Sequence, residues 1–530
     1  MSSQNKRFRR SSKTGDLPRR EFIKLAGAAG LSSSLFGSML SLPAHAAEKP
    51  KYGGKITVGV AASQQNNSLD PARYFSESDI LRGNALYDRL VNPGPDMMPV
   101  PHLAESWESD ADATKWVFRL RKGVHFHNGK SLVPEDVIYS FNHHLDEKSE
   151  SPAKAYFSQI REMKRVDDHS VQFTLESPNV EFPMILADLR AHIIPEGYSD
   201  FTTTTVGTGP FKVKVFKPGS TYIFVRNPDY WGAGGPYVDE IEYIGISDPT
   251  ARVNALMSGD IDIMVDLDPK VVPLIRRNPR LSLIQSKSGQ HRAVVMMLDR
   301  EPTRDNNLRL AMKYGIDRER IMTNVFKGFG QIGNDHPISP IDPYYNRDIP
   351  QRVYDPDKAR YYIKKAGFEN KPLDLYTSPI TGAGSIPSCE VFQETARAAG
   401  IHLNIKKIPA DSYWTTAWMN KPICTTTWES RTADMMFSIA YKSDAPWNET
   451  AWKNKHFDEL LLQARSARDF QRRKQIYGEM QGMLQQEGGV IVMAFVDILD
   501  AAHERIKGIK PNPTGLLGGY MFATDVWIDS

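Results

Sequence analysis

Strand-like and helix-like segments alternate along residues 47–530, with no internal repeat and no low-complexity linker between them. Residues 55–60, 116–120 and 171–175 alternate between polar and apolar side chains, as a strand with one buried face does. Residues 490–496 are a continuous apolar run, which is typical of a strand buried on both faces. The pattern predicts an α/β protein with mixed sheets, whose parts are joined by several strand crossings rather than by one tether.

Two helices are predicted in the same part of the chain. Pro134 suits the first turn of a helix, Glu135 and Asp136 suit its positive end, and apolar residues follow at four-residue spacing as far as Leu145. A second apolar stripe predicts one longer helix over about 457–486, which the glycines at 488–489 would end.

The first 46 residues differ in composition from the rest of the chain. They contain eight Lys and Arg against two Asp and Glu, then a weakly apolar stretch and an A-x-A pattern at 44–46. This layout is typical of a secretory signal peptide. Residues 19–24 (RREFIK) resemble the twin-arginine signal, which implies export of the folded protein to the periplasm. No later window has 18 uninterrupted apolar residues, so we expect no membrane span in the exported chain.

Charge and cysteine content exclude several classes of protein. The 530 residues carry a net charge of +3, which is too small to indicate a nucleic-acid partner, and 40% hydrophobic residues exclude disorder as the main state. Without residues 1–46 the net charge becomes −3, so any positive charge used in function must be local. Cys389 and Cys424 cannot staple a fold of this length, and the sequence leaves open whether they pair.

Motifs of enzymes and metal sites are absent or stand in the wrong context. Residues 328–333 fit G-x-G-x-x-G, but a helix precedes them and 334–337 cannot easily start another, which favours a loop. His125 and His127 could face one way on a strand, yet no third ligand accompanies them. The aspartates between 260 and 268 lack the Gly and Glu of an EF-hand loop. No nucleophile, base and orienting group can be assembled, so we expect a binding protein without catalysis, cofactor or metal.

Eight short segments follow one another in order between residues 86 and 318. They are residues 86–90 (LYDRL), 99–107 (PVPHLAESW), 116–130 (WVFRLRKGVHFHNGK), 134–137 (PEDV), 207–211 (GTGPF), 227–231 (NPDYW), 258–263 (SGDIDI) and 308–318 (LRLAMKYGIDR). Each segment alone is weakly specific. The ordered series resembles the peptide/opine/nickel family of extracytoplasmic solute-binding proteins (bacterial solute-binding family 5), which are the receptors of ABC importers.

The resemblance implies the two-lobed periplasmic binding protein fold of the large three-domain type, with a ligand cleft that closes by a hinge. Lobe I would have a core domain, formed by residues 47–80, 195–285 and 498–530, and an inserted domain at 81–194. Lobe II would be residues 286–497. The implied partners are a peptide or other small-molecule ligand and the permease and ATPase subunits of the importer. We expect the binding protein to be a monomer that binds no nucleic acid.

The resemblance also indicates candidate ligand-binding residues in lobe II. Peptide binders of the family commonly have a Gly-Trp segment, followed closely by an Asp that pairs with the amino terminus of the peptide. Trp428 matches the Trp, but Arg431 stands at the position of the Asp, where it would repel an ammonium group and attract a carboxylate or phosphate. Asp434 or Glu429 could supply the acid if the local alignment shifts. The other candidates are Trp414, Trp418, Arg292 and the lobe I loop of Ser63, Gln64, Gln65 and Asn66.

These residues predict a ligand with at least one anionic group, held by Arg431 against Trp428. The alternative for Arg431 itself is a surface or structural ion pair. Two alternatives also stay open for the whole chain. It could be a receptor for a metal–chelate or polycarboxylate complex, in which Arg431 would meet the carboxylates of the chelator. It could also be a secreted hydrolase, for which the sequence offers no motif.

Overall fold

The computed structural model describes residues 49–61 and 68–529. The chain divides into two units, and residues 50–530 are described here by themselves. The expected signal peptide lies outside the described residues, as do the loop candidates Ser63, Gln64, Gln65 and Asn66. Within the described ranges, no helix is long and apolar enough to cross a membrane.

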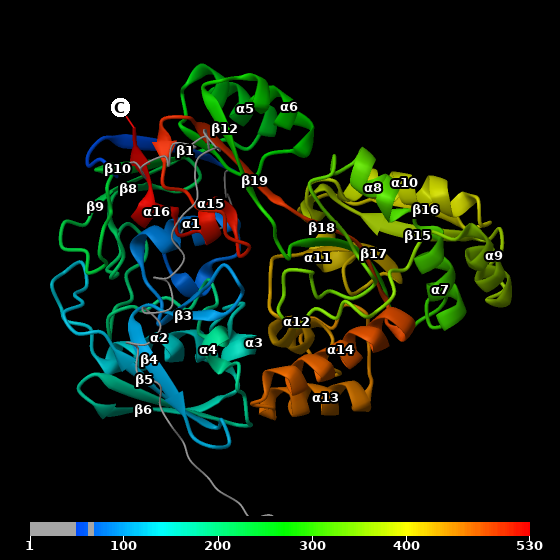
Figure 1. The fold of residues 1–530 in the computed structure, drawn as a ribbon, viewed down its shortest axis with the longest axis horizontal. Helices are drawn as coiled ribbons and strands as arrows, with labels where there is room; N and C mark the ends of the chain where they lie inside the picture. Colours follow the sequence, from blue (N-terminus) through cyan, green and yellow to red (C-terminus); the bar gives the residue numbers. More distant parts are fainter. Residues whose placement is uncertain (1–48, 62–67, 530) are drawn as a thin grey trace, which may run out of the picture. The chain divides into compact units, whose positions relative to one another are not determined.

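A seven-stranded sheet forms one side of this unit (Figure 1). The strand that comes first in the chain, β1 (Lys55–Val60), pairs in parallel with both of its neighbours. The other pairings are antiparallel, so the sheet is mixed as predicted. In spatial order its strands are β12 (Leu281–Ser286), β19 (Ile498–His503), β11 (Ile263–Met264), β1 (Lys55–Val60), β10 (Glu240–Gly245), β9 (Thr221–Arg226) and β8 (Phe211–Lys217).

Two further large sheets complete the framework. The antiparallel four-stranded sheet has the order β4 (Ala104–Ser109), β5 (Lys115–Leu120), β7 (Ser170–Leu175) and β6 (Ile160–Asp167). The six-stranded sheet has the order β14 (Gly330–Ile332), β18 (Val490–Val496), β13 (His291–Met296), β17 (Ile423–Trp428), β15 (Pro372–Thr377) and β16 (His402–Lys407). Two small ribbons pair β2 (Val91–Pro93) with β3 (Pro99–Pro101), and β20 (Ile506–Lys507) with β21 (Trp527–Ile528).

The strands of each large sheet belong to one expected domain, apart from Ser286 at the end of β12. We therefore use lobe I for residues 50–285 with 498–529, and lobe II for residues 286–497; the exact domain boundaries stay a prediction. Strands cross between the lobes twice, from β12 into β13 and from β18 into β19, and Figure 1 shows the second crossing as a nearly continuous ribbon. The expected strand crossings are thus present.

Helices pack against these sheets and connect their strands. In chain order they are α1 (Glu77–Leu86), α2 (Pro134–Leu145), α3 (Lys154–Phe157), α4 (Phe182–Ile185), α5 (Pro249–Ser258), α6 (Val272–Arg277), α7 (Asn306–Gly315), α8 (Arg318–Asn324), α9 (Pro356–Lys365), α10 (Ser385–Arg397), α11 (Tyr413–Thr416), α12 (Ala433–Ala440), α13 (Lys455–Ser466), α14 (Phe470–Glu487), α15 (Leu516–Gly519) and α16 (Phe522–Asp525).

The predicted strands are confirmed as β1, β5, β7 and β18, and all seven residues of β18 are buried. The helix opened by Pro134 is confirmed as α2, where the Asp136 carboxylate accepts a hydrogen bond of 2.9 Å from the amide of Val133. The histidines at 125 and 127 do not lie on a regular strand, because His125 forms only an isolated bridge with Ser131.

The single helix predicted over about 457–486 is wrong, because α13 ends at Ser466 and α14 begins at Phe470. Ala467 has an extended backbone, with φ −79° and ψ 106°. Asp469 then caps α14 by accepting a hydrogen bond of 2.7 Å from the amide of Arg472. Both helices bury their apolar stripe in the same core, so the periodicity continues across the break and hides it. The cap at Asp469 was the available signal.

Candidate functional site

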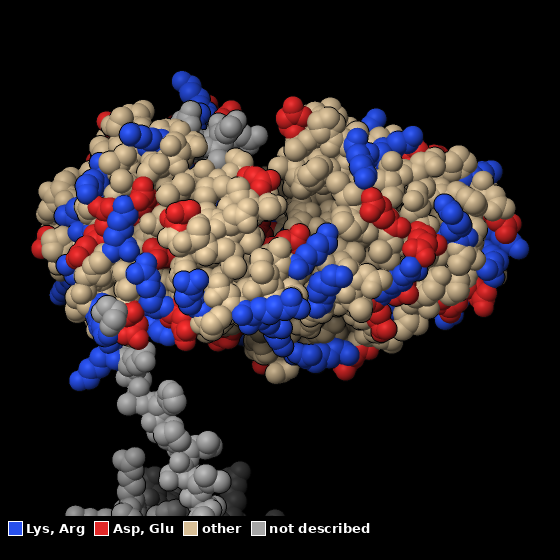
Figure 2. All heavy atoms as spheres, turned by 90° about the horizontal axis from the view of Figure 1, so that it is seen from above, with Lys and Arg blue, Asp and Glu red and all other residues tan. Residues whose placement is uncertain are grey.

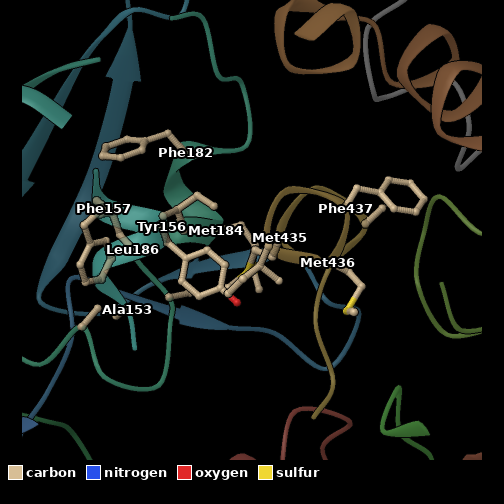
Figure 3. Packing of buried hydrophobic residues seen from close by; sticks show 14 of the residues in the cluster. Ala153, Tyr156, Phe157, Phe182, Met184, Leu186, Met435, Met436 and Phe437 are labelled. Carbon is tan, nitrogen blue, oxygen red and sulfur yellow. The ribbon is translucent and has the colours of Figure 1, made fainter. Parts of the chain in front are cut away.

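A narrow cavity of about 40 Å³ lies between the lobes and is lined by residues of both. Lobe I contributes Ile80, Met184 and the turn 187–190, and lobe II contributes residues 429–432 and Met435. We call this the Arg431 cavity. Figure 3 shows Met435 of α12 directed toward Tyr156 and Met184 of lobe I, in one apolar cluster. The space-filling view is hollowed where the lobes meet, with side chains of both charges near the rim (Figure 2).

Arg431 stands in the short segment between β17 and α12, where it contacts both lobes. Its Nη1 pairs with Glu429 Oε2 at 2.7 Å, and its Nε donates a hydrogen bond of 2.8 Å to the hydroxyl of Tyr156 in α3. Its guanidinium lies over the Trp428 ring, 4.9 Å from the centroid. Burial acts to raise the pKa of Glu429, but the charges of Arg431 and Arg190 prevail and hold this pKa at about 2. Arg431 therefore has a permanently charged partner in the same cavity wall.

The tryptophan candidates form a cluster behind Arg431. Trp428 and Trp418 each donate a hydrogen bond of 2.9 Å from Nε1 to the carboxylate of Glu449, whose pKa burial raises. Trp414 packs edge-on against Trp418, with ring centroids 5.5 Å apart, and is 37% exposed. None of the three lines the Arg431 cavity. The structure thus brings Trp428 and Arg431 together, as predicted, and places Trp414 and Trp418 outside the cavity lining.

Asp434 forms a buried ion pair within lobe II. Its carboxylate accepts two hydrogen bonds from Arg465, from Nε at 2.6 Å and from Nη2 at 3.1 Å. The hydroxyl of Tyr477 lies 3.4 Å from the same carboxylate. Asp434 is fully buried and is not part of the lining of the cavity. This geometry gives Asp434 a structural contact that joins α12 to α13.

A second narrow cavity of about 40 Å³ also has walls from both lobes, and we call it the Arg292 cavity. Arg292 of β13 donates from Nη1 to Thr427 Oγ1 at 2.7 Å and from Nε to the carbonyl of Ala383 at 3.4 Å. Across the cavity, Glu77 of α1 accepts hydrogen bonds from Gln290 at 3.0 Å and from the hydroxyl of Tyr520 at 3.3 Å. Burial, with the charges of Asp266 and Glu429, raises the pKa of Glu77 to about 8.

Three residues in or beside these cavities could not be recognised from the sequence. Glu77, Gln290 and Tyr156 belong to no recognised motif, and their contacts cross between the lobes. Ser76 caps α1 in a capping box with Asp79, which is a readable helix start. The helix start alone does not reveal that the first residue of α1 faces lobe II.

The described residues show no alternative site of the metal or dinucleotide type. No group of three or more His, Cys, Asp or Glu in ranges 49–61 and 68–529 is arranged to hold a metal ion. Cys389 and Cys424 are both buried and free. The G-x-G-x-x-G segment was expected to be a loop, but it includes the short strand β14, which pairs with β18.

The sequence and the fold are both similar to those of known proteins. Residues 98–449 match the family described as "Bacterial extracellular solute-binding proteins, family 5 Middle". Di/tripeptide-binding protein 2 of Pseudomonas aeruginosa is 26% identical over 525 residues, covering 91% of this chain and 97% of that protein. Among solved structures, the periplasmic binding protein DppA of Helicobacter pylori in complex with the peptide STSA has a TM-score of 0.79 and 22% identity, covering 91% and 99% of the two chains. The binding protein AgaA of A. tumefacien R10 in complex with agropinic acid has a TM-score of 0.79 and 23% identity, covering 90% and 99%.

Proposed function

Because the chain belongs to the bacterial extracellular solute-binding proteins of family 5, we propose that it captures a peptide-like, opine-like or other small anionic solute by lobe closure. The two-lobed α/β fold and the role of solute-binding component of an ABC importer, predicted from the ordered segments, are confirmed. Its partners are accordingly the permease and ATPase subunits of such an importer. We propose the periplasm as its location and the twin-arginine signal at residues 19–24 as its export route.

One observation carries this proposal, which is that both cavities draw their walls from both lobes. A group of the solute that enters either cavity would contact lobe I and lobe II at once. Such a solute interacts with the closed arrangement more than with an open one, so its binding favours closure. Arginines and carboxylates among apolar side chains are the lining expected for a small polar solute.

Two observations indicate the chemical class of the solute. The similar DppA and AgaA are solved with a peptide and with agropinic acid, so the same fold accommodates both kinds of compound. The sequence resemblance puts Arg431 where peptide binders of the family commonly have the acid that receives the amino terminus, and this assignment stays a prediction. Arg431 and Arg292 both line cavities between the lobes. We therefore propose that the solute carries an anionic group, and that the protein binds it as a monomer without catalysing its conversion.

Mass spectrometry of the solute that co-purifies with the protein tests this function. The exported chain, residues 47–530, is purified without denaturation from cells grown in a peptide-rich medium, and its bound compounds are released with acid. We expect one small acidic compound in near-equal molar amount, which the protein returns unchanged after prolonged incubation. Release of a metal together with the compound would favour the chelate receptor, and conversion of the compound would favour a hydrolase. An empty protein whose melting temperature the medium filtrate does not raise contradicts the proposal.

A further inference from the structure

Arg292 is a buried cation in a cavity wall, and no described carboxylate pairs with it. Its side chain is 9% exposed and lines the Arg292 cavity. Both hydrogen bonds that it donates go to neutral oxygens, the hydroxyl of Thr427 and the carbonyl of Ala383. In contrast, Arg431 and Arg465 each bind a carboxylate at 2.6–2.7 Å. Asp266, Glu77 and Glu429 act on the charge of Arg292 without forming a close ion pair with it. A buried charge is unfavourable unless hydrogen-bonded ions compensate it, so a ligand anion in direct contact with the guanidinium would be stabilised there.

The position of the Arg292 guanidinium is fixed by the backbone beside it. Gly382 has a φ of +94°, which favours glycine, and a Cβ there would lie 2.5 Å from Nε and 2.7 Å from Cζ of Arg292. The guanidinium can therefore lie flat against the main chain only because residue 382 has no side chain. Together with the contacts to Thr427 and Ala383, this arrangement orients the planar fork before any ligand arrives, which favours bidentate binding.

The other charged groups of the cavity indicate which anion would fit. The carboxyl groups of Asp266 and Asp497 line the same cavity, with Glu77 beside them, so a doubly charged phosphate would meet more repulsion there than a singly charged carboxylate. A carboxylate carries one charge and matches the single guanidinium. Its two oxygens also match the spacing of the guanidinium donors.

We propose that Arg292 is the anchor for a carboxylate group of the solute. This inference rests on the proposed solute-binding function and deepens it, because it names the group that the solute presents and the residue that receives it. Arg431 then has a different part, since Glu429 already neutralises it and Tyr156 already binds it. Arg431 holds the lobes together beside the solute, while Arg292 binds the anionic group.

The proposal is tested with variants of Arg292 and a matched control. Arg292→Met keeps most of the volume but removes the charge, and Arg292→Lys keeps the charge but removes the planar fork. Arg277→Met is the control, because Arg277 is exposed on α6 and does not line the cavity. The probe is the filtrate of a peptide-rich growth medium, used before and after methyl esterification of its carboxyl groups. The readouts are the rise in melting temperature and the compound released from the purified protein.

We expect untreated filtrate to stabilise wild type and Arg277→Met equally, and esterified filtrate to stabilise neither. Arg292→Met should retain less than a tenth of the compound that wild type retains, since a charge-assisted pair changes affinity about 10- to 100-fold. Full retention by Arg292→Met, or equal stabilisation by esterified filtrate, overturns the inference. If Arg292→Met does not fold, Arg292→Lys decides, and undiminished retention there overturns it as well. A wild-type protein that binds nothing from the filtrate contradicts the solute-binding function itself.

Discussion

Arg431 of lobe II donates a hydrogen bond of 2.8 Å from Nε to the hydroxyl of Tyr156 in lobe I. The same guanidinium pairs with Glu429 and lies over Trp428, so one side chain connects the end of β17 with α3. Met435 and Met184 pack beside this contact, as Figure 3 shows. The contact can form only when the two lobes approach, which ties it to the closed arrangement.

Tyr156→Phe removes the acceptor of this hydrogen bond and keeps the aromatic ring. We expect the dissociation rate of the bound solute to rise about 10- to 100-fold, because a hydrogen bond to a charged group contributes about 1.5–3 kcal/mol. The measurement is stopped-flow dissociation after dilution or competition. Tyr354→Phe is the control, since its hydroxyl donates 3.0 Å to the carbonyl of Thr395 within lobe II. Equal dissociation rates in the two variants would show that the contact does not restrain opening.

Arg468 forms a second contact between the lobes, on the surface and at the break between α13 and α14. Its Nη2 donates to Oγ of Ser109, the last residue of β4, at 2.8 Å, and its Nε donates to the carbonyl of Ala111 in the following turn at 3.0 Å. Arg468→Ala should weaken solute binding about threefold, since exposed contacts of this kind contribute about 0.5–1 kcal/mol. Titration calorimetry measures the change, with the neighbouring exposed Arg472→Ala as control. An unchanged affinity in Arg468→Ala would exclude a role for this contact in closure.

Asp434→Asn tests whether this residue serves the ligand or the fold. Removing one partner of a buried ion pair leaves Arg465 uncompensated, so we expect a loss of about 3–5 kcal/mol in the free energy of unfolding. The affinity of the remaining folded protein should be unchanged, because Asp434 lines neither cavity. Urea unfolding gives the first quantity and calorimetry the second. The control is Asp374→Asn, whose exposed pair with Lys406 at 3.7 Å should contribute less than about 1 kcal/mol. A stable Asp434→Asn variant with lost affinity would reverse this assignment.

Short sequence patterns predicted the helices and strands that depend on interactions between residues close together in the chain. Pro134 with the following acids predicted α2, and the apolar run of β18 predicted a buried strand. The break between α13 and α14 was missed because the apolar stripe continues through Ala467. The start of α14 is set by the cap at Asp469, which the stripe does not reveal. Periodicity reports which face is buried, and it does not report where the backbone turns.

The candidate site was predictable only along one stretch of chain. Trp428 and Arg431 are neighbours in sequence, so their contact could be anticipated from the resemblance. The partners that define their chemistry come from far away, with Tyr156 lying 275 residues before Arg431. Asp434 was a reasonable candidate acid by position, and its pairing with Arg465 depends on how α12 packs on α13. Arg292 ranked below the other lobe II candidates, and its surroundings depend on distant segments, because Glu77 and Asp266 of lobe I line the same cavity without forming a close ion pair with it.

Glu77 should make the stability of the protein depend on pH, because its carboxyl group is placed where its charge is unfavourable. Burial first, and then the charges of Asp266 and Glu429, raise its pKa from about 4.5 to about 8. Between these values the folded state keeps the proton that the unfolded state has lost. The stabilisation from protonated Glu77 is therefore complete below about pH 4.5 and is lost as pH rises through 8.

Glu77→Gln stays neutral at every pH and keeps an oxygen that can accept from Gln290 and Tyr520. We expect the free energy of unfolding of wild type, relative to the variant, to fall by on the order of 3–4 kcal/mol between pH 5 and pH 8. Urea unfolding at four pH values across this range measures the difference, with the exposed Glu319→Gln as control. Only the comparison with wild type isolates this residue, because other groups titrate equally in both proteins. Parallel curves for wild type and Glu77→Gln would mean that Glu77 is charged in the folded protein, and that the Arg292 cavity is more accessible to water than its lining indicates.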